Sequence, residues 1–135
     1  DMGVPVSKVP AAIKAFREIA DRHDVIVATY GHASDGNLHT KMMVDPYSRE
    51  NWERGMAAVG EIFDKCIELG GTVTGEHGVG IAKALDFKKE RASNIKTYRE
   101  IKRAMDPNNI LNPGKTFDFE GDPLAGLRYP CQECQ

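Results

Sequence analysis

The chain has 135 residues, 41% of them apolar, which is enough for one globular domain with a single hydrophobic core. Its 18 basic and 20 acidic side chains leave a formal net charge of −2, so we expect no nucleic-acid partner. No apolar run is long enough to span a membrane, and the first residues lack the pattern of a signal peptide. The three cysteines form no disulfide framework, which predicts a reducing, cytoplasmic location. Because the sequence opens abruptly on Asp1, we expect a piece of a longer protein.

The first part of the chain predicts a helix followed by two strands. Apolar residues recur at positions 9, 13, 16 and 19 or 20, which is helical spacing, and Ser7 is the expected N-cap. The β-branched run 25–30 predicts a strand. A second strand is expected at 38–44, where Leu38, Met42 and Val44 share one face.

The second part predicts a long helix, a short strand and a last helix. The long helix begins after Ser48, a suitable N-cap, and stops at Gly70-Gly71. A short strand follows at 72–74, and the last helix stops at Asp106-Pro107. The residues expected to face inward are Trp52, Met56, Val59, Phe63 and Cys66 in the long helix and Ile95, Tyr98, Ile101 and Met105 in the last one.

This order of elements predicts an α+β fold. A hairpin in the middle of the chain requires antiparallel pairing, so we expect a small antiparallel sheet with helices packed on one face, ferredoxin-like in arrangement. The domain is expected to cover residues 1–119, and residues 120–135 to form an irregular tail. Cys131 and Cys134 in that tail are too few for an iron–sulfur or zinc site by themselves.

Three of the four histidines lie in two short polar motifs, residues 31–39 and residues 75–80. In the first motif, Asp35-Gly36 is typical of a two-residue hairpin turn. That turn would place His32 directly opposite His39, with Cβ atoms about 4.5–5.5 Å apart. Two imidazoles so placed can share one metal ion. Equally, both can be structural histidines without a ligand.

The second motif, residues 75–80, supplies a carboxylate and another imidazole. Glu76 is a suitable third ligand beside His32 and His39, and His77 is then free for proton transfer. Two histidines and one carboxylate with an open position are typical of catalytic zinc or iron. The glycines of this motif do not follow the order of a dinucleotide-binding fingerprint, so phosphate binding here is disfavoured.

Taken together, the motif from Gly31 to His39, the motif from Gly75 to Gly80 and the stretch from Asp106 to Lys115 resemble the C-terminal domain of FAD-linked oxidases. The similarity is to the branch that holds D-lactate dehydrogenase, D-2-hydroxyglutarate dehydrogenase and the flavin subunit of glycolate oxidase. It runs in order from Asp1 to about Phe119.

The resemblance implies a role for each matching residue. His32, His39 and Glu76 match the metal ligands, with zinc the usual metal; His77 matches the catalytic base. Asn37 matches a residue that faces the substrate, and Asn112 falls where the family's last motif approaches the flavin. The implied activity is oxidation of a 2-hydroxy acid such as lactate, glycolate or 2-hydroxyglutarate to the 2-oxo acid. FAD would be held mainly by a separate N-terminal domain.

The residues also allow two alternative functions and predict an exposed apolar surface. The same histidines would also suit a metal-dependent hydrolase or a non-catalytic binding module. The strand 25–30 is apolar on both faces. Helices can cover one face, and we expect the flavin domain to cover the other. Alone, the chain would expose this patch and form a homodimer through it.

Overall fold

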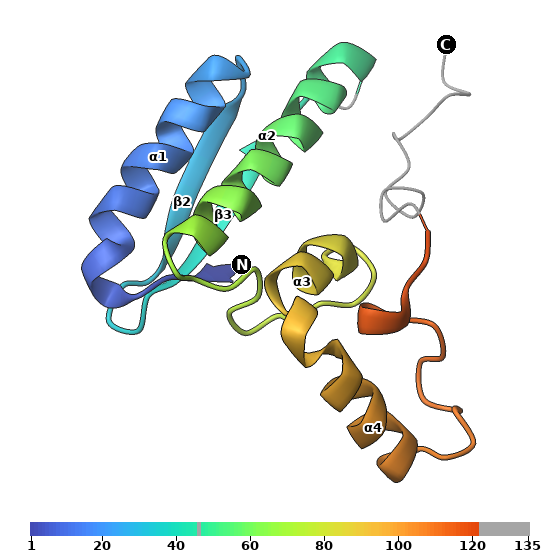
Figure 1. The fold of residues 1–135 in the computed structure, drawn as a ribbon. Helices are drawn as coiled ribbons and strands as arrows, with labels where there is room; N and C mark the ends of the chain where they lie inside the picture. The colour runs from blue at the N-terminus through green and yellow to red at the C-terminus, as the bar shows by residue number, and fades with distance from the viewer. Residues whose placement is uncertain (46, 122–135) are drawn as a thin grey trace.

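The computed structural model describes residues 1–45 and 47–121 of the chain (Figure 1). Cys131 and Cys134 therefore lie outside the described residues. The strands are β1 (Met2–Gly3), β2 (Ile26–His32) and β3 (Asn37–Met43). The helices are α1 (Val9–Arg22), α2 (Arg49–Glu68), α3 (Ala84–Glu90) and α4 (Ile95–Met105). This mixture confirms the predicted α+β class.

The three strands form an antiparallel sheet in the order β1-β3-β2. The predicted strand 72–74 is reduced to a single antiparallel bridge, in which Thr72 pairs with Gly3 at the outer edge of β1. Counting that bridge as a fourth strand position, the chain runs βαββαβ, which is the ferredoxin-like arrangement predicted from the sequence.

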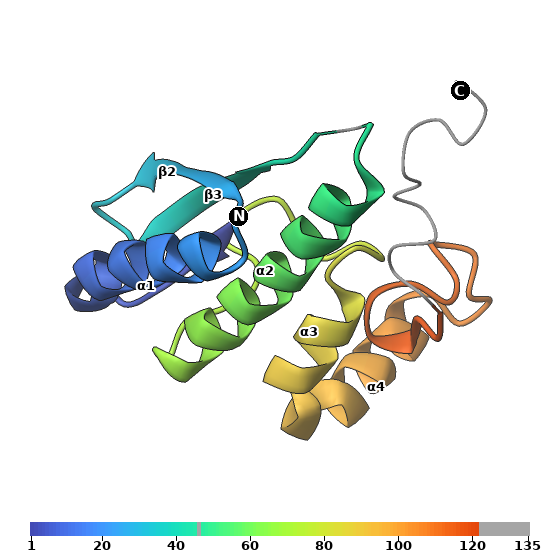
Figure 2. The same cartoon turned by 90° about the horizontal axis from the view of Figure 1, so that it is seen from above.

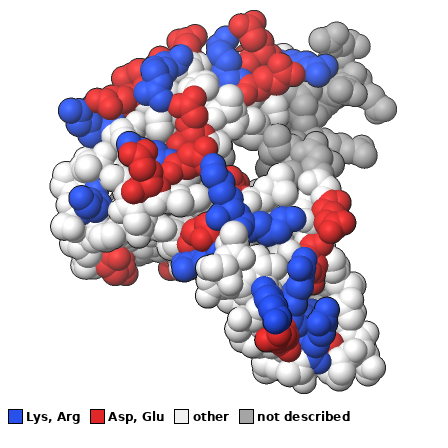
Figure 3. All heavy atoms as spheres, viewed as in Figure 1, with Lys and Arg blue, Asp and Glu red and all other residues white. Residues whose placement is uncertain are grey.

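Helices α1 and α2 cover one face of the sheet and leave the other open (Figure 2). The core lies between these helices and the sheet, around the fully buried side chains of Met2, Phe16 and Cys66. On the open face, the strands expose Ile26, Tyr30 and Met43. The helical side is polar outside: in Figure 3, basic and acidic side chains are intermixed over the helices.

Helix α2 follows its predicted limits, and of its predicted inward residues Cys66 alone is fully buried. The Ser48 hydroxyl accepts the Asn51 N–H, as expected of an N-cap, and Gly70 adopts the positive φ of a helix stop. The buried stripe is Gly55, Ala58, Ile62 and Cys66, with the larger predicted residues only partly buried. Gly55 explains the shift, because a Cβ there would lie 2.4 Å from Cγ1 of Val44. Small residues bring the helix close to the sheet.

Other expectations about the helices are corrected in the same way. In α1, Ala12 is buried and Ile13 is exposed, and the chain enters through a 3₁₀ turn (Val6–Lys8), so Ser7 is not the N-cap. Helix α4 ends at Met105 as predicted, yet Ile101 and Met105 are exposed. The short helix α3 was not predicted. Its Phe87 stacks on Tyr98 of α4, which packs the two helices together beyond α2.

No helix in the described part of the chain is both long enough and apolar enough to cross a membrane.

Candidate metal centre

The hairpin β2–β3 brings two of the predicted site histidines to the open face of the sheet. The predicted register is wrong: Tyr30 lies opposite His39, and His32 lies opposite Asn37. The reason is a longer turn, because the N–H groups of both Asp35 and Gly36 donate to the His32 carbonyl. The slip is two residues, and side chains alternate with a period of two, so both imidazoles stay on one face. Their ring centroids are 5.6 Å apart.

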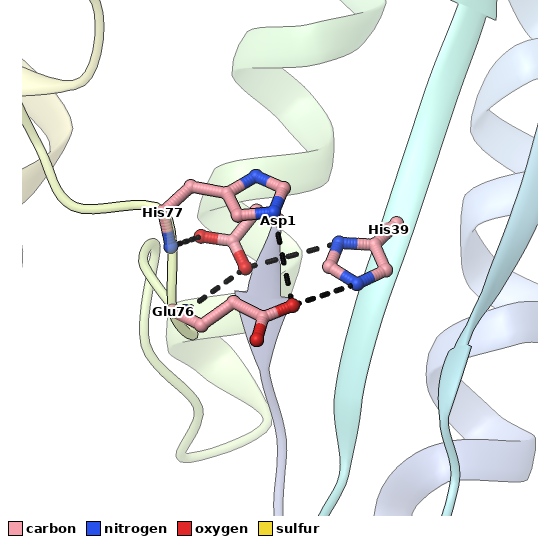
Figure 4. Close-up of side chains that lie close together, drawn as sticks. All are labelled: Asp1, His39, Glu76 and His77. Carbon is pink, nitrogen blue, oxygen red and sulfur yellow. Dashed lines mark hydrogen bonds and ion pairs between the residues drawn. The ribbon is translucent and has the colours of Figure 1, made fainter.

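A second segment, the turn Gly75–His77, faces this hairpin. Its backbone is held by the carboxylate of Asp1, which accepts the N–H groups of Gly75, Glu76 and His77 at 3.0, 3.0 and 3.1 Å. The turn is thereby fixed beside the start of β1, and Glu76 points towards His39 (Figure 4). The structure thus brings Glu76 and His77 to the hairpin histidines, as predicted from the two motifs.

Three imidazoles converge on one oxygen of Glu76. The Nε2 atoms of His39, His32 and His77 lie 3.1, 3.6 and 3.7 Å from Glu76 Oε1. The rings of His39 and His77 are stacked, with centroids 4.9 Å apart. Imidazole nitrogens and a carboxylate oxygen are the donors that zinc and iron take from proteins. The donor chemistry of this cluster therefore fits a divalent cation.

Burial within the cluster is uneven. The His39 side chain is only 12% exposed, whereas those of His32, Glu76 and His77 are at least half exposed. Nδ1 of His39 is buried and has no hydrogen-bond partner among the described residues; its nearest carboxylate is Asp1, at 3.9 Å. The centre is thus anchored on one buried histidine and open on its other side.

The closest group of metal-compatible side chains differs from the predicted ligand set. Asp1, His39, Glu76 and His77 each offer a ligand atom within 4.8 Å of the others, and His32 stands at the margin through its contact with Glu76. Sequence reasoning missed Asp1. A single acidic residue before a two-residue strand gives no periodic signal, and only the fold brings it to the turn.

Asn37, predicted to face the substrate, lies beneath the turn. It is buried on the same strand face as His39, and its Oδ1 has no partner in the part of the chain that the structure describes. A Cβ at Gly75 would lie 2.2 Å from that oxygen. Gly75 is therefore needed for the turn to approach Asn37.

The structure does not bring Asn112 to this group. Asn112 is exposed in the loop that follows α4. The C-terminal end of α4, where this loop begins, points away from the sheet (Figure 1). That loop is held by Asp106, whose carboxylate accepts a hydrogen bond from Lys102 and the N–H groups of Ile110 and Leu111. These donors, Lys102 foremost, lower the pKa of Asp106 to about 2.

The fold and this cluster define an α+β domain that presents a histidine–carboxylate centre on an open sheet face. The family described as FAD linked oxidases, C-terminal domain, matches residues 1–116. The chain belongs to this family.

Three curated relatives illustrate the likeness. The chain is 47% identical over 121 residues to glycolate oxidase subunit GlcD of Bacillus subtilis, covering 87% of the chain and 25% of the relative. It is 34% identical over 116 residues to D-lactate dehydrogenase of Archaeoglobus fulgidus, covering 85% of the chain and 25% of the relative. It is 34% identical over 123 residues to D-2-hydroxyglutarate dehydrogenase of Stutzerimonas stutzeri, covering 87% and 26%. The chain thus spans about a quarter of the length of these relatives.

Proposed function

We propose that the chain is the metal-binding and substrate-binding part of an FAD-dependent enzyme that oxidises a D-2-hydroxy acid to the 2-oxo acid. The observation that carries the proposal is the convergence of three Nε2 atoms on one Glu76 oxygen, within 3.7 Å, on an open sheet face. The names of the relatives support the substrate class, since glycolate, lactate and 2-hydroxyglutarate are all 2-hydroxy acids.

In this proposal, His32, His39 and Glu76 hold a divalent cation, with zinc the favoured metal. When bound, such a cation would lower the pKa of a neighbouring hydroxyl group, and FAD would take the hydrogen of the α-carbon together with both electrons, as a hydride. His77 is the base and accepts the hydroxyl proton at a ring nitrogen, which requires a neutral imidazole near pH 7. Its exposed position beside Glu76 leaves room for a substrate.

The polar residues around the centre complete the proposed site. Asn37 lies beneath the turn on the strand that carries His39, with its amide oxygen buried, and its contact with the substrate stays a prediction. Asn112 would approach the flavin from the loop after α4, where its exposure leaves it free to contact another domain. The domain itself is proposed to extend over residues 1–119.

FAD is proposed to be held by the rest of a longer protein. The N–H groups of Gly75, Glu76 and His77 already donate to Asp1, so this glycine-rich turn does not offer them to a phosphate. The same additional domain would cover the exposed Ile26, Tyr30 and Met43. The homodimer and the cytoplasmic location stay predictions.

The test is metal binding by the chain, with a matched pair of histidine variants. His39→Ala removes the buried anchor of the centre, whereas His23→Ala removes a histidine that pairs with Glu61 elsewhere. We expect zinc to bind the wild type and the His23 variant with equal affinity, and affinity to fall by more than about 100-fold in the His39 variant. Isothermal titration measures all three. Equal binding by the two variants would refute the site.

A further inference from the structure

We propose that Asp1 is a positioning residue of this centre: its carboxylate fixes the turn that carries Glu76 and His77 and stands behind His39. The proposal rests on the proposed metal-binding function and deepens it. The Asp1 side chain is only 3% exposed, so its negative charge is enclosed by the groups around it.

The first step of the argument is that the Asp1 carboxylate is occupied by donors. Oδ2 accepts the N–H groups of Gly75 and His77, and Oδ1 accepts that of Glu76. Lys83 donates to Oδ2 at 3.1 Å and to the Asp1 backbone carbonyl at 2.6 Å. A carboxylate with three backbone donors and an ammonium group has its lone pairs engaged. Asp1 therefore acts on the backbone rather than as a metal ligand.

The second step concerns the two nitrogens of His39. Nε2 faces Glu76 at 3.1 Å, and the buried Nδ1 faces Asp1 Oδ1 at 3.9 Å (Figure 4). No hydrogen bond joins these two atoms at this distance, but the negative charge of Asp1 near Nδ1 favours the tautomer that carries its proton there. The lone pair of Nε2 is then directed towards Glu76, where a cation would lie. One carboxylate thus orients both parts of the centre, the hairpin and the turn.

The third step is that the segment 72–77, which includes the turn, depends on side chains for its backbone hydrogen bonds. Beyond the bridge at Thr72 it has no neighbouring strand in the described structure, and Glu90 of α3 accepts the Val73 N–H at 2.8 Å. Gly75, Glu76 and His77 are exposed, so without Asp1 their N–H groups would bond to water and the turn would lose its attachment to the start of β1. The turn would then no longer hold Glu76 and His77 against the hairpin.

The test compares Asp1→Ala with Asp106→Ala. Asp106 is a matched control, because it also accepts two backbone N–H groups and a lysine, but in the loop after α4. Without metal, hydrogen exchange of the amides of residues 75–77 should become at least about tenfold faster in Asp1→Ala and stay unchanged in Asp106→Ala. Cobalt(II) affinity should fall by about 10- to 100-fold in Asp1→Ala alone, with a changed visible spectrum.

Asp1→Asn keeps the size of the side chain and one acceptor oxygen, so it should lie between wild type and Asp1→Ala in both measurements. It also provides the measurement should the alanine variant not fold. The proposal would be overturned if hydrogen exchange at residues 75–77 were unchanged in both Asp1→Ala and Asp1→Asn. It would also be overturned if Asp106→Ala lost as much cobalt affinity as Asp1→Ala. If the wild type binds no cobalt, the proposed metal function fails, while hydrogen exchange still decides the role of Asp1.

Discussion

Nε2 of His39 and Oε1 of Glu76 lie 3.1 Å apart, and this contact joins the hairpin to the glycine-rich turn. His39 is the most buried of the three imidazoles around Glu76, and it comes from the central strand of the sheet. His39 pairs with Tyr30 of β2, and the neighbouring Leu38 also pairs with Met2 of β1, whereas His32 lies at the end of the edge strand β2. The centre is therefore rigid at His39 and adjustable around it.

The assignment of ligand and base can be tested by comparing His32→Ala with His77→Ala. If His32 is a ligand and His77 the base, zinc affinity of the chain should fall by more than about 100-fold in the first variant and change only a few-fold in the second. Calorimetric titration distinguishes them. The opposite order would make His77 the ligand, in agreement with its place in the closest group of four.

Gly31 in β2 should not tolerate a side chain. Its φ is +147°, and a Cβ there would lie 2.3 Å from the Asn37 carbonyl oxygen, so we expect Gly31→Ala to cost about 1–3 kcal/mol of unfolding free energy. Gly60→Ala is the control: nothing lies within 4 Å of its Cβ position in α2, and it should stabilise the chain by about 0.5–1 kcal/mol. Urea unfolding measures both. Equal effects would contradict the strained geometry at Gly31.

The Cys66 thiol should resist alkylation in the folded chain. It is fully buried, its single S–H lies within reach of the carbonyl oxygens of Gly3 and Thr72, and burial raises the pKa of the thiol to about 11. At pH 8 the thiolate fraction is then about 100-fold below that of an unshifted thiol. The measurement is mass spectrometry of the Cys66 peptide after timed iodoacetamide treatment. It gives the ratio of the alkylation rates in the folded chain and in the urea-unfolded chain. Similar rates in both states would show that the thiol is accessible.

Asp106 should make stability depend on acid pH. Its pKa, about 2 in the fold, lies below the ordinary 3.8 of an aspartate because of Lys102 and two backbone N–H groups. The folded state therefore favours the carboxylate, so this stabilisation is complete above pH 4 and is lost as the pH falls towards 2. Asp106→Asn should be less stable at pH 7 and lose less stability between pH 4 and pH 2. Unfolding midpoints measured across this range would contradict the prediction if the two proteins lost stability in parallel.

The parts of the fold that the sequence predicted are those with local signals. The limits of α2 follow from Ser48 and Gly70, whose capping roles depend on neighbouring residues only. The shared face of His32 and His39 was predicted despite the wrong register, because alternation along a strand survives a two-residue slip. Tertiary contacts decided the inward face of α2, where close approach to Val44 selects Gly55.

The candidate site was predicted in its side chains but not in what holds them. Histidines and a carboxylate in short polar motifs are visible in one dimension. The contact between Asp1 and the turn is not, because its partners lie up to 76 positions apart and no pattern connects them. The exposed Met105 was predicted inward for the same reason, since helical spacing reveals an apolar stripe but not its neighbour.

Two sets of contacts described above also affect how the chain folds. One is the bridge between Gly3 and Thr72, and the other is the set of hydrogen bonds that the turn donates to Asp1. Both join the first residues to a segment more than half the chain away, so they close long loops in the described part of the chain. Contacts of such sequence separation form late, after local helices and the hairpin. The centre is then complete only when the first strand has docked. Metal binding would report that the whole sheet has assembled, and a chain lacking its first strand would present the same histidines without a place for the ion.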